Sequence, residues 1–140
     1  MTITQRMTGM AAAAMILLLA ACSSPAKPLD TAALADAVTV TSGSIESTSI
    51  ETGRDGTTTV LYVKPTITTE GLTADELDAL LKVVYTESLG AVSTIEIRTV
   101  DANDDSVDLE PAASELGIHY LSHPNFISYS TEILKDAYGD

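Results

Sequence analysis

The chain contains very little cysteine, because Cys22 is the only one among its 140 residues. A single cysteine excludes a disulfide within the chain and a metal site built from several thiolates. Tryptophan is absent and phenylalanine occurs once, so five tyrosines supply most of the aromatic content. Basic residues are also scarce, with 7 against 20 acidic ones and a formal net charge of −13. Such a charge repels nucleic-acid phosphates, so we expect no nucleic-acid partner.

Motifs that carry well-known chemistries are also missing. The sequence has no glycine-rich phosphate loop and no serine flanked by glycines of the type found in hydrolases. Ser122 and His123 are neighbours, but no glycine lies beside them to form the sharp turn that a nucleophilic serine requires. The missing motifs therefore favour a non-catalytic domain over an enzyme.

The N-terminal region carries the most informative pattern in the chain. An apolar run at residues 10–21 is shorter than the ~20 residues that cross a membrane, and its length is typical of a signal-peptide core. The run ends in the tetrad Leu19, Ala20, Ala21 and Cys22. This region resembles the export signal of bacterial lipoproteins, whose lipobox is a leucine, two small residues and a cysteine.

The resemblance implies a lipid anchor. Leu19, Ala20 and Ala21 would be recognised by a signal peptidase, and Cys22 would become the first mature residue, carrying a diacylglyceryl group. Two acyl chains such as palmitate hold a protein on a membrane, whereas one chain binds only reversibly. The domain would then face outside the cytoplasm, on the outer face of the cell membrane or, in a source with two membranes, on the outer membrane. We expect no cofactor apart from this lipid.

The remaining sequence predicts a tether and one domain. Residues 22–30 combine prolines with small polar residues, which favours a flexible, hydrated tether, and residues 31–140 suffice for a single domain. Threonine-rich and β-branched segments on either side of a glycine-containing turn at residues 52–56 predict a hairpin over residues 44–64. The expected fold class is α+β. It would combine a small, mostly antiparallel sheet, made of the hairpin and one or two further strands, with helices packed on one face.

One helix is specified especially well, at residues 73–89. Thr73 and Glu76 form a capping box, and Leu72 with Leu77 forms a hydrophobic staple. Gly90 follows as the expected stop. Shorter helices are expected at residues 29–38, 111–116 and 130–138, and further strands at residues 94–100, 118–121 and 126–129.

An acidic turn at residues 101–106 is a candidate cation site. Asp101, Asn103 and Asp105 match positions 1, 3 and 5 of an EF-hand calcium loop. Ser106 stands where that loop requires glycine, and Ala112 stands where it requires a bidentate glutamate. The pattern therefore favours a solvated turn that uses its Asp and Asn side chains for local hydrogen bonds.

His119 and His123 are the only histidines and form a second candidate. On a helix they would share one face and could bind one metal ion, but Pro124 and the β-prone neighbours argue against a helix. On a strand they would lie ~13 Å apart, too far for a single ion. A surface or turn role is therefore favoured over a metal-binding or general-base role.

Tyr62 is the tyrosine best suited to an interface, since alternation along its strand places it opposite Leu61 and Val63. The sequence as a whole predicts a lipid-anchored, extracytoplasmic, acidic domain that binds another protein of the cell envelope. Two alternatives stay open. One is an enzyme-like domain that binds a small ligand or cation through the segment from His119 to Tyr129, and the other is a structural surface lipoprotein.

Overall fold

The computed structural model describes residues 28–139. The predicted signal peptide, its lipobox, Cys22 and residues 22–27 of the tether lie outside the described residues. Within the described part the elements are α1 (Thr31–Thr39), β1 (Ile45–Asp55), β2 (Thr58–Ile67), α2 (Ala74–Glu87), β3 (Thr94–Ile97), α3 (Glu110–Leu116), β4 (Leu121–Ser122), β5 (Ile127–Ser130) and α4 (Thr131–Tyr138).

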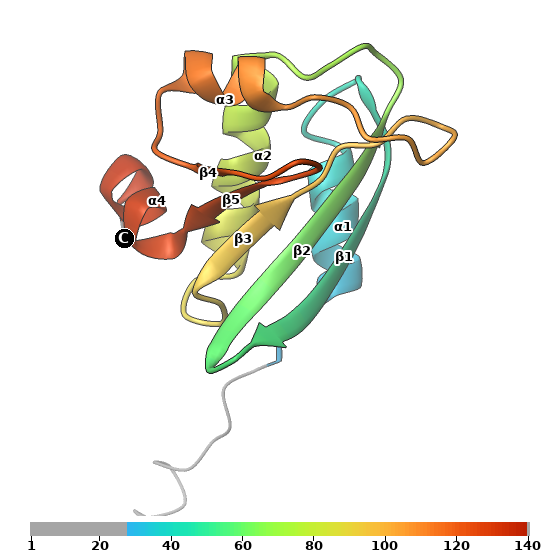
Figure 1. The fold of residues 1–140 in the computed structure, drawn as a ribbon. Helices are drawn as coiled ribbons and strands as arrows, with labels where there is room; N and C mark the ends of the chain where they lie inside the picture. The colour runs from blue at the N-terminus through green and yellow to red at the C-terminus, as the bar shows by residue number, and fades with distance from the viewer. Residues whose placement is uncertain (1–27, 140) are drawn as a thin grey trace, which may run out of the picture.

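The five strands form one mixed sheet in the order β1-β2-β3-β5-β4 (Figure 1). β1 and β2 are an antiparallel hairpin, and β3 lies parallel to β2 because α2 carries the chain back across the sheet. β5 is antiparallel to both β3 and β4. The expected α+β class and the antiparallel majority are confirmed. Three strands accompany the hairpin, where one or two were expected in the sheet. They lie at or next to the three segments expected to be strands, and β4 shares only Leu121 with the expected residues 118–121.

The hairpin turn is tighter than the sequence indicated. It consists of Gly56, at a φ of 62°, and Thr57, whereas Gly53 and Arg54 continue β1 in register with β2. A glycine at positive φ is typical of two-residue hairpin loops, so Gly56 fits this turn. The predicted turn at residues 52–56 was therefore wrong at its start, and Gly53 needs another explanation.

The helices leave one face of the sheet uncovered. In Figure 1, α1 and α2 lie together behind the sheet, and α3 and α4 pack against α2 on that same side. The core forms between this helical layer and the sheet. Its largest fully buried side chains come from both layers: Tyr129, Leu61, Leu77, Leu80, Leu81, Ile95, Ile97, Ile127, Leu134, Val38, Val63 and Val84.

The start of α2 is built as the sequence predicts. The Thr73 hydroxyl accepts from the Glu76 N–H at 3.2 Å, and the Thr73 N–H donates to Glu76 Oε2 at 2.8 Å. The other carboxylate oxygen, Oε1, accepts from the hydroxyls of Ser42 and Ser44 at 2.5 and 2.6 Å. These hydrogen bonds, led by those from Ser42 and Ser44, lower the pKa of Glu76 to about 2. One carboxylate therefore ties α2 to the loop between α1 and β1.

The C-terminal helix is attached to α2 through tyrosines. The Tyr138 hydroxyl donates to Asp78 Oδ1 at 2.8 Å, and the Tyr85 hydroxyl donates to the carbonyl of Gly139 at 3.1 Å. The rings of Tyr85 and Tyr138 pack with their centroids 6.1 Å apart. Tyr129 differs, because its hydroxyl is buried and has no hydrogen-bond partner among the described residues.

No helix within residues 28–139 has the length and apolarity needed to cross a membrane.

Candidate functional site

The uncovered face of the sheet carries a continuous row of side chains. The strand registers place Glu51 of β1 beside Tyr62 of β2, Tyr62 beside Glu96 of β3, and Glu96 beside Ser128 of β5. Leu61 and Ile95, on the opposite side of the same strands, are fully buried beneath the helices. Alternation along β2 and β3 thus separates a structural face from a face that is open to solvent, whereas Ser128 at the β5 end of the row is buried.

A shallow hollow of about 150 Å³ lies on this open face. It is lined by Tyr62, Lys64, Glu96, Arg98 and Phe126, together with Val63. Three of these residues are charged, yet carbon atoms form almost all of the lining, so the aliphatic stems face the hollow. The hollow therefore has an apolar surface framed by two cations and one carboxylate.

Tyr62 is held across the sheet by a close approach to β1. Its side chain is 39% exposed. Tyr62 is the only tyrosine among the exposed large apolar residues of the described chain. A Cβ atom added at Gly53 would lie 2.6 Å from Tyr62 Cε2, which is far too close for any real contact. Glycine at position 53 thus lets the ring lie over β1, which accounts for a glycine inside this strand. The structure places Tyr62 on the open face, as the sequence predicted.

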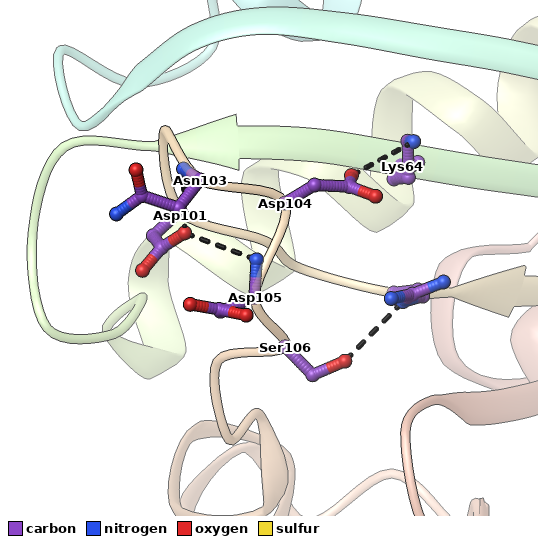
Figure 2. Close-up of polar contacts among 7 residues, drawn as sticks. Lys64, Asp101, Asn103, Asp104, Asp105 and Ser106 are labelled. Atoms are coloured by element: carbon purple, nitrogen blue, oxygen red, sulfur yellow. Dashed lines mark hydrogen bonds and ion pairs between the residues drawn. The ribbon is translucent and has the colours of Figure 1, made fainter.

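The two cations of the hollow contact the acidic turn (Figure 2). Lys64 Nζ forms an ion pair with Asp104 Oδ1 at 3.1 Å, and both side chains are largely exposed. Arg98 Nε donates to the Ser106 hydroxyl at 3.3 Å, and Arg98 forms no ion pair among the described residues. The guanidinium of Arg98 is therefore available to a carboxylate from outside the domain.

Glu96 lies beside these cations on the sheet. Burial raises the pKa of its carboxyl, and the charge of His123 partly offsets that rise. The raised pKa follows from the partial removal of Glu96 from water at the centre of the row. Burial and the negative charge of Asp55 thus both favour the neutral form of this carboxyl relative to a carboxyl in water.

The acidic turn is closed by hydrogen bonds of its own. Asp101 Oδ1 accepts from the backbone N–H groups of Asn103, at 2.8 Å, and Asp105, at 3.0 Å. Asp104 adopts a φ of 65°, which Asp tolerates better than most residues. Figure 2 shows Asp101, Asn103 and Asp105 with their side chains on one side of the turn. Within residues 28–139, no three His, Cys, Asp or Glu side chains are grouped so that they could hold a metal ion.

The two histidines have different surroundings. The His123 ring stacks on the Phe126 ring, with ring centroids 4.2 Å apart and an angle of 14° between the ring planes. The backbone N–H of His123 donates a hydrogen bond to the backbone carbonyl of Phe126 at 3.0 Å. These contacts close the turn between β4 and β5. His119 is exposed in the segment between α3 and β4. His123, but not His119, lines a second hollow, so the structure does not bring the pair together in one site.

The second hollow has a volume of about 220 Å³ and shares Phe126 with the hollow beside Tyr62. Asp108, Glu110 and His123 are among the residues that line it. The hydroxyl of Ser122 donates to Glu110 Oε1, which attaches the β4–β5 hairpin to α3. The hydroxyl of Ser122 therefore takes part in a contact that holds the β4–β5 hairpin against α3.

Sequence reasoning identified Tyr62 but missed the residues around it. Lys64 shares its face by alternation, but Glu96, Arg98 and Phe126 come from strands and turns that are distant in the chain. The only sequence signal for Glu96 and Arg98 was the alternation along residues 94–98, which placed both on a solvent-facing side of their strand. Comparison of the chain with protein-family models, with curated proteins and with solved structures finds no match.

Proposed function

We propose that this protein is a lipid-anchored, extracytoplasmic binding domain that holds a protein partner of the cell envelope on the open face of its sheet. The anchor rests on the lipobox resemblance that ends at Cys22. The binding role rests on one observation, the apolar hollow beside the exposed ring of Tyr62.

The size of the hollow favours a side chain over a small molecule. Ligand pockets usually measure ~300–1,000 Å³, whereas this hollow measures about 150 Å³ and is open to solvent. A volume of this size suits one apolar side chain of a protein partner. Tyrosine and arginine, which both line the hollow, are the residue types most enriched in the energetically important parts of protein interfaces.

The charges around the hollow suggest the chemistry of the partner. The domain is acidic, so most of its surface repels acidic partners at long range. Arg98 and Lys64 are a local exception, and Arg98 has no carboxylate partner among the described residues. We therefore expect a partner segment that presents an apolar side chain next to a carboxylate.

The binding role is tested by comparing what variants of the full-length protein retain in cells. Crosslinked cells that contain the wild-type chain, Tyr62→Ala or Arg98→Glu are extracted, and captured proteins are quantified by mass spectrometry. We expect the captured amount of one envelope protein to fall roughly 30-fold with both variants, which matches the ~2 kcal/mol of an interface hot spot. Lys82→Glu is the matched control, since Lys82 is exposed on α2 and pairs with Asp78. Equal capture by all four chains would contradict the proposal.

The anchor is tested separately by Cys22→Ser, because serine cannot accept the thioether-linked lipid. We expect the variant to move from the membrane fraction to the soluble fraction, as judged by immunoblotting. Retention of the variant on the membrane would contradict the lipid anchor and would leave the binding role of Tyr62 untouched.

A further inference from the structure

The outer edge of β1 is an unpaired strand edge. β1 has β2 as its only neighbour and forms the right-hand border of the sheet in Figure 1. Within the described residues, no backbone hydrogen bond from another segment reaches residues 46–55. The opposite border of the sheet is β4, which has only two residues and offers little edge.

Edge strands of this length are normally protected. Proline, lysine, inward-facing charges and β-bulges are the usual means. β1 contains neither proline nor lysine, and its one register shift lies at its start, between Ile45 and Ser47. A register shift between Ile45 and Ser47 bends one end of the strand, and beyond it Ser47–Asp55 pairs with β2 without interruption. The exposed edge is therefore able to accept another strand.

We propose that a second copy of this chain pairs with β1, so that two sheets join edge to edge around a two-fold axis. An axis perpendicular to the sheet makes the two β1 strands antiparallel, and it keeps the helices of both copies on the same side. Such an interface is isologous, so each residue must suit the residue that lies opposite it in the other copy.

One register satisfies this condition over Ser47–Gly53, within the uninterrupted part of the strand. When the axis passes through Ile50, that residue lies opposite its own copy, and Thr48 lies opposite Thr52. The same register brings Glu46 of each copy, the residue at the register shift, next to Arg54 of the other copy at both ends of the interface. Glu46 and Arg54 are exposed, and neither forms an ion pair among the described residues. Opposite charges facing each other across strands stabilise the pairing.

The neighbouring registers are worse. With the axis through Glu51, the two copies of that carboxylate would lie directly opposite each other, which is destabilising. With the axis through Ser49, Arg54 would lie opposite Ser44, in the loop before β1. The pattern of charges along β1 thus selects the register that is centred on Ile50.

The first test is disulfide trapping in cells that produce two tagged copies of the full-length chain. Ser49→Cys in one copy and Glu51→Cys in the other place two exposed thiols opposite each other, at a Cα separation of ~5 Å that suits a disulfide. Ser49→Cys with Asp55→Cys is the control, since that pair would lie ~13 Å out of register. The parent chain controls for Cys22. We expect a linked dimer from the first pair only, and equal trapping of both pairs would overturn the proposed register.

Charge-reversal variants, made in the chains that carry Ser49→Cys and Glu51→Cys, test the proposed register more sharply. Glu46→Arg and Arg54→Glu should each reduce the linked dimer by roughly five-fold, because each variant places like charges opposite each other at both ends. The double variant should restore it. Within one chain these two residues are ~26 Å apart, so restoration can only arise between copies. If net charge alone governed association, Glu46→Arg would instead increase the dimer. Such an increase, or a double variant that is not restored, would overturn the proposal.

Discussion

The two faces of the sheet are made by neighbouring residues and have opposite properties. In β2, Leu61 and Val63 are at most 1% exposed and pack under the helices, whereas Tyr62 between them is 39% exposed. The covered face has aliphatic side chains packed to exclude water, which is what stabilises a domain of this size. The open face has an aromatic ring, two cations and an apolar hollow. A change to the first should therefore affect stability, and a change to the second should affect binding.

The largest difference in stability is expected between an aspartate placed in the core and an aspartate placed on the open face. Leu80 on α2 is fully buried, so Leu80→Asp introduces an unpaired charge into the core and removes its packing. Replacing a buried leucine by alanine already costs ~2–5 kcal/mol, a large part of the ~5–15 kcal/mol that stabilises a typical domain. We expect no cooperative unfolding transition for Leu80→Asp by circular dichroism.

Tyr62→Asp is the matched control on the open face. The aspartate there stays in contact with water, so we expect a melting temperature within a few degrees of the wild type. A cooperative transition in Leu80→Asp, or the loss of folding in Tyr62→Asp, would remove the distinction between the two faces.

Glu76 provides the next largest effect, and it depends on pH. Its lowered pKa means that the ionised carboxylate is stabilised in the folded state by Ser42, Ser44 and Thr73. This contribution is fully present above its ordinary pKa of 4.5 and is lost as the pH falls through about 2. We expect Glu76→Gln to lower the free energy of unfolding by roughly 1–3 kcal/mol at pH 7.

Urea unfolding of the wild type and Glu76→Gln at several pH values measures this effect. The difference between the two proteins should shrink as the pH falls from about 5 towards 2, because protonation removes the charge that the serines recognise. A difference that stays constant over that range would show that the carboxylate charge contributes nothing.

One substitution at two tyrosines should change stability in opposite directions. Tyr138→Phe removes the hydrogen bond to Asp78, so we expect it to lower stability by ~1 kcal/mol. Tyr129→Phe removes a buried hydroxyl that has no partner within the described residues. The stability of this variant should therefore stay the same or rise by up to ~1 kcal/mol. Thermal melts of both variants check the signs. A Tyr129→Phe variant less stable than Tyr138→Phe would contradict the buried, unpaired state of that hydroxyl.

The smallest effect on stability is expected at Gly53, on the open face. Gly53→Ala would force the Tyr62 ring to move, but that ring is the exposed end of a rotatable side chain, so stability should change by less than ~1 kcal/mol. The NMR resonances of Tyr62 should shift clearly. In a Tyr62→Ala background the alanine has no ring to displace, so any destabilisation by Gly53→Ala should vanish there. An equal effect in both backgrounds would contradict the close approach.

The parts of the fold that could be predicted are those with local signals. The capping box at Thr73 and Glu76 identified the start of α2, because its hydrogen bonds join residues three apart. The predicted C-terminal end of this helix was less accurate, since α2 ends at Glu87 and not directly before Gly90. Gly53 was taken for a turn residue because local sequence cannot show that a ring from the next strand covers it.

The hollow could be predicted only in part. Alternation placed Tyr62 on a solvent-facing side, and the structure agrees. The neighbours Arg98 and Phe126 join it because β3 runs parallel to β2 and β5 pairs with β3, and this strand order is a long-range property. The bonds of Ser42 and Ser44 to Glu76 were missed for the same reason, since they connect residues more than 30 positions apart.

Site-specific photo-crosslinking in intact cells tests most directly whether the open face holds a protein partner. A photoreactive phenylalanine derivative replaces Tyr62 on the open face or, in a second strain, Val40 after α1, which is 83% exposed. A binding role for the open face predicts one discrete crosslinked envelope protein from position 62, lost when Arg98 is changed to glutamate, and none from position 40. The same products from both positions, or products at position 62 that persist in the Arg98→Glu chain, would contradict it.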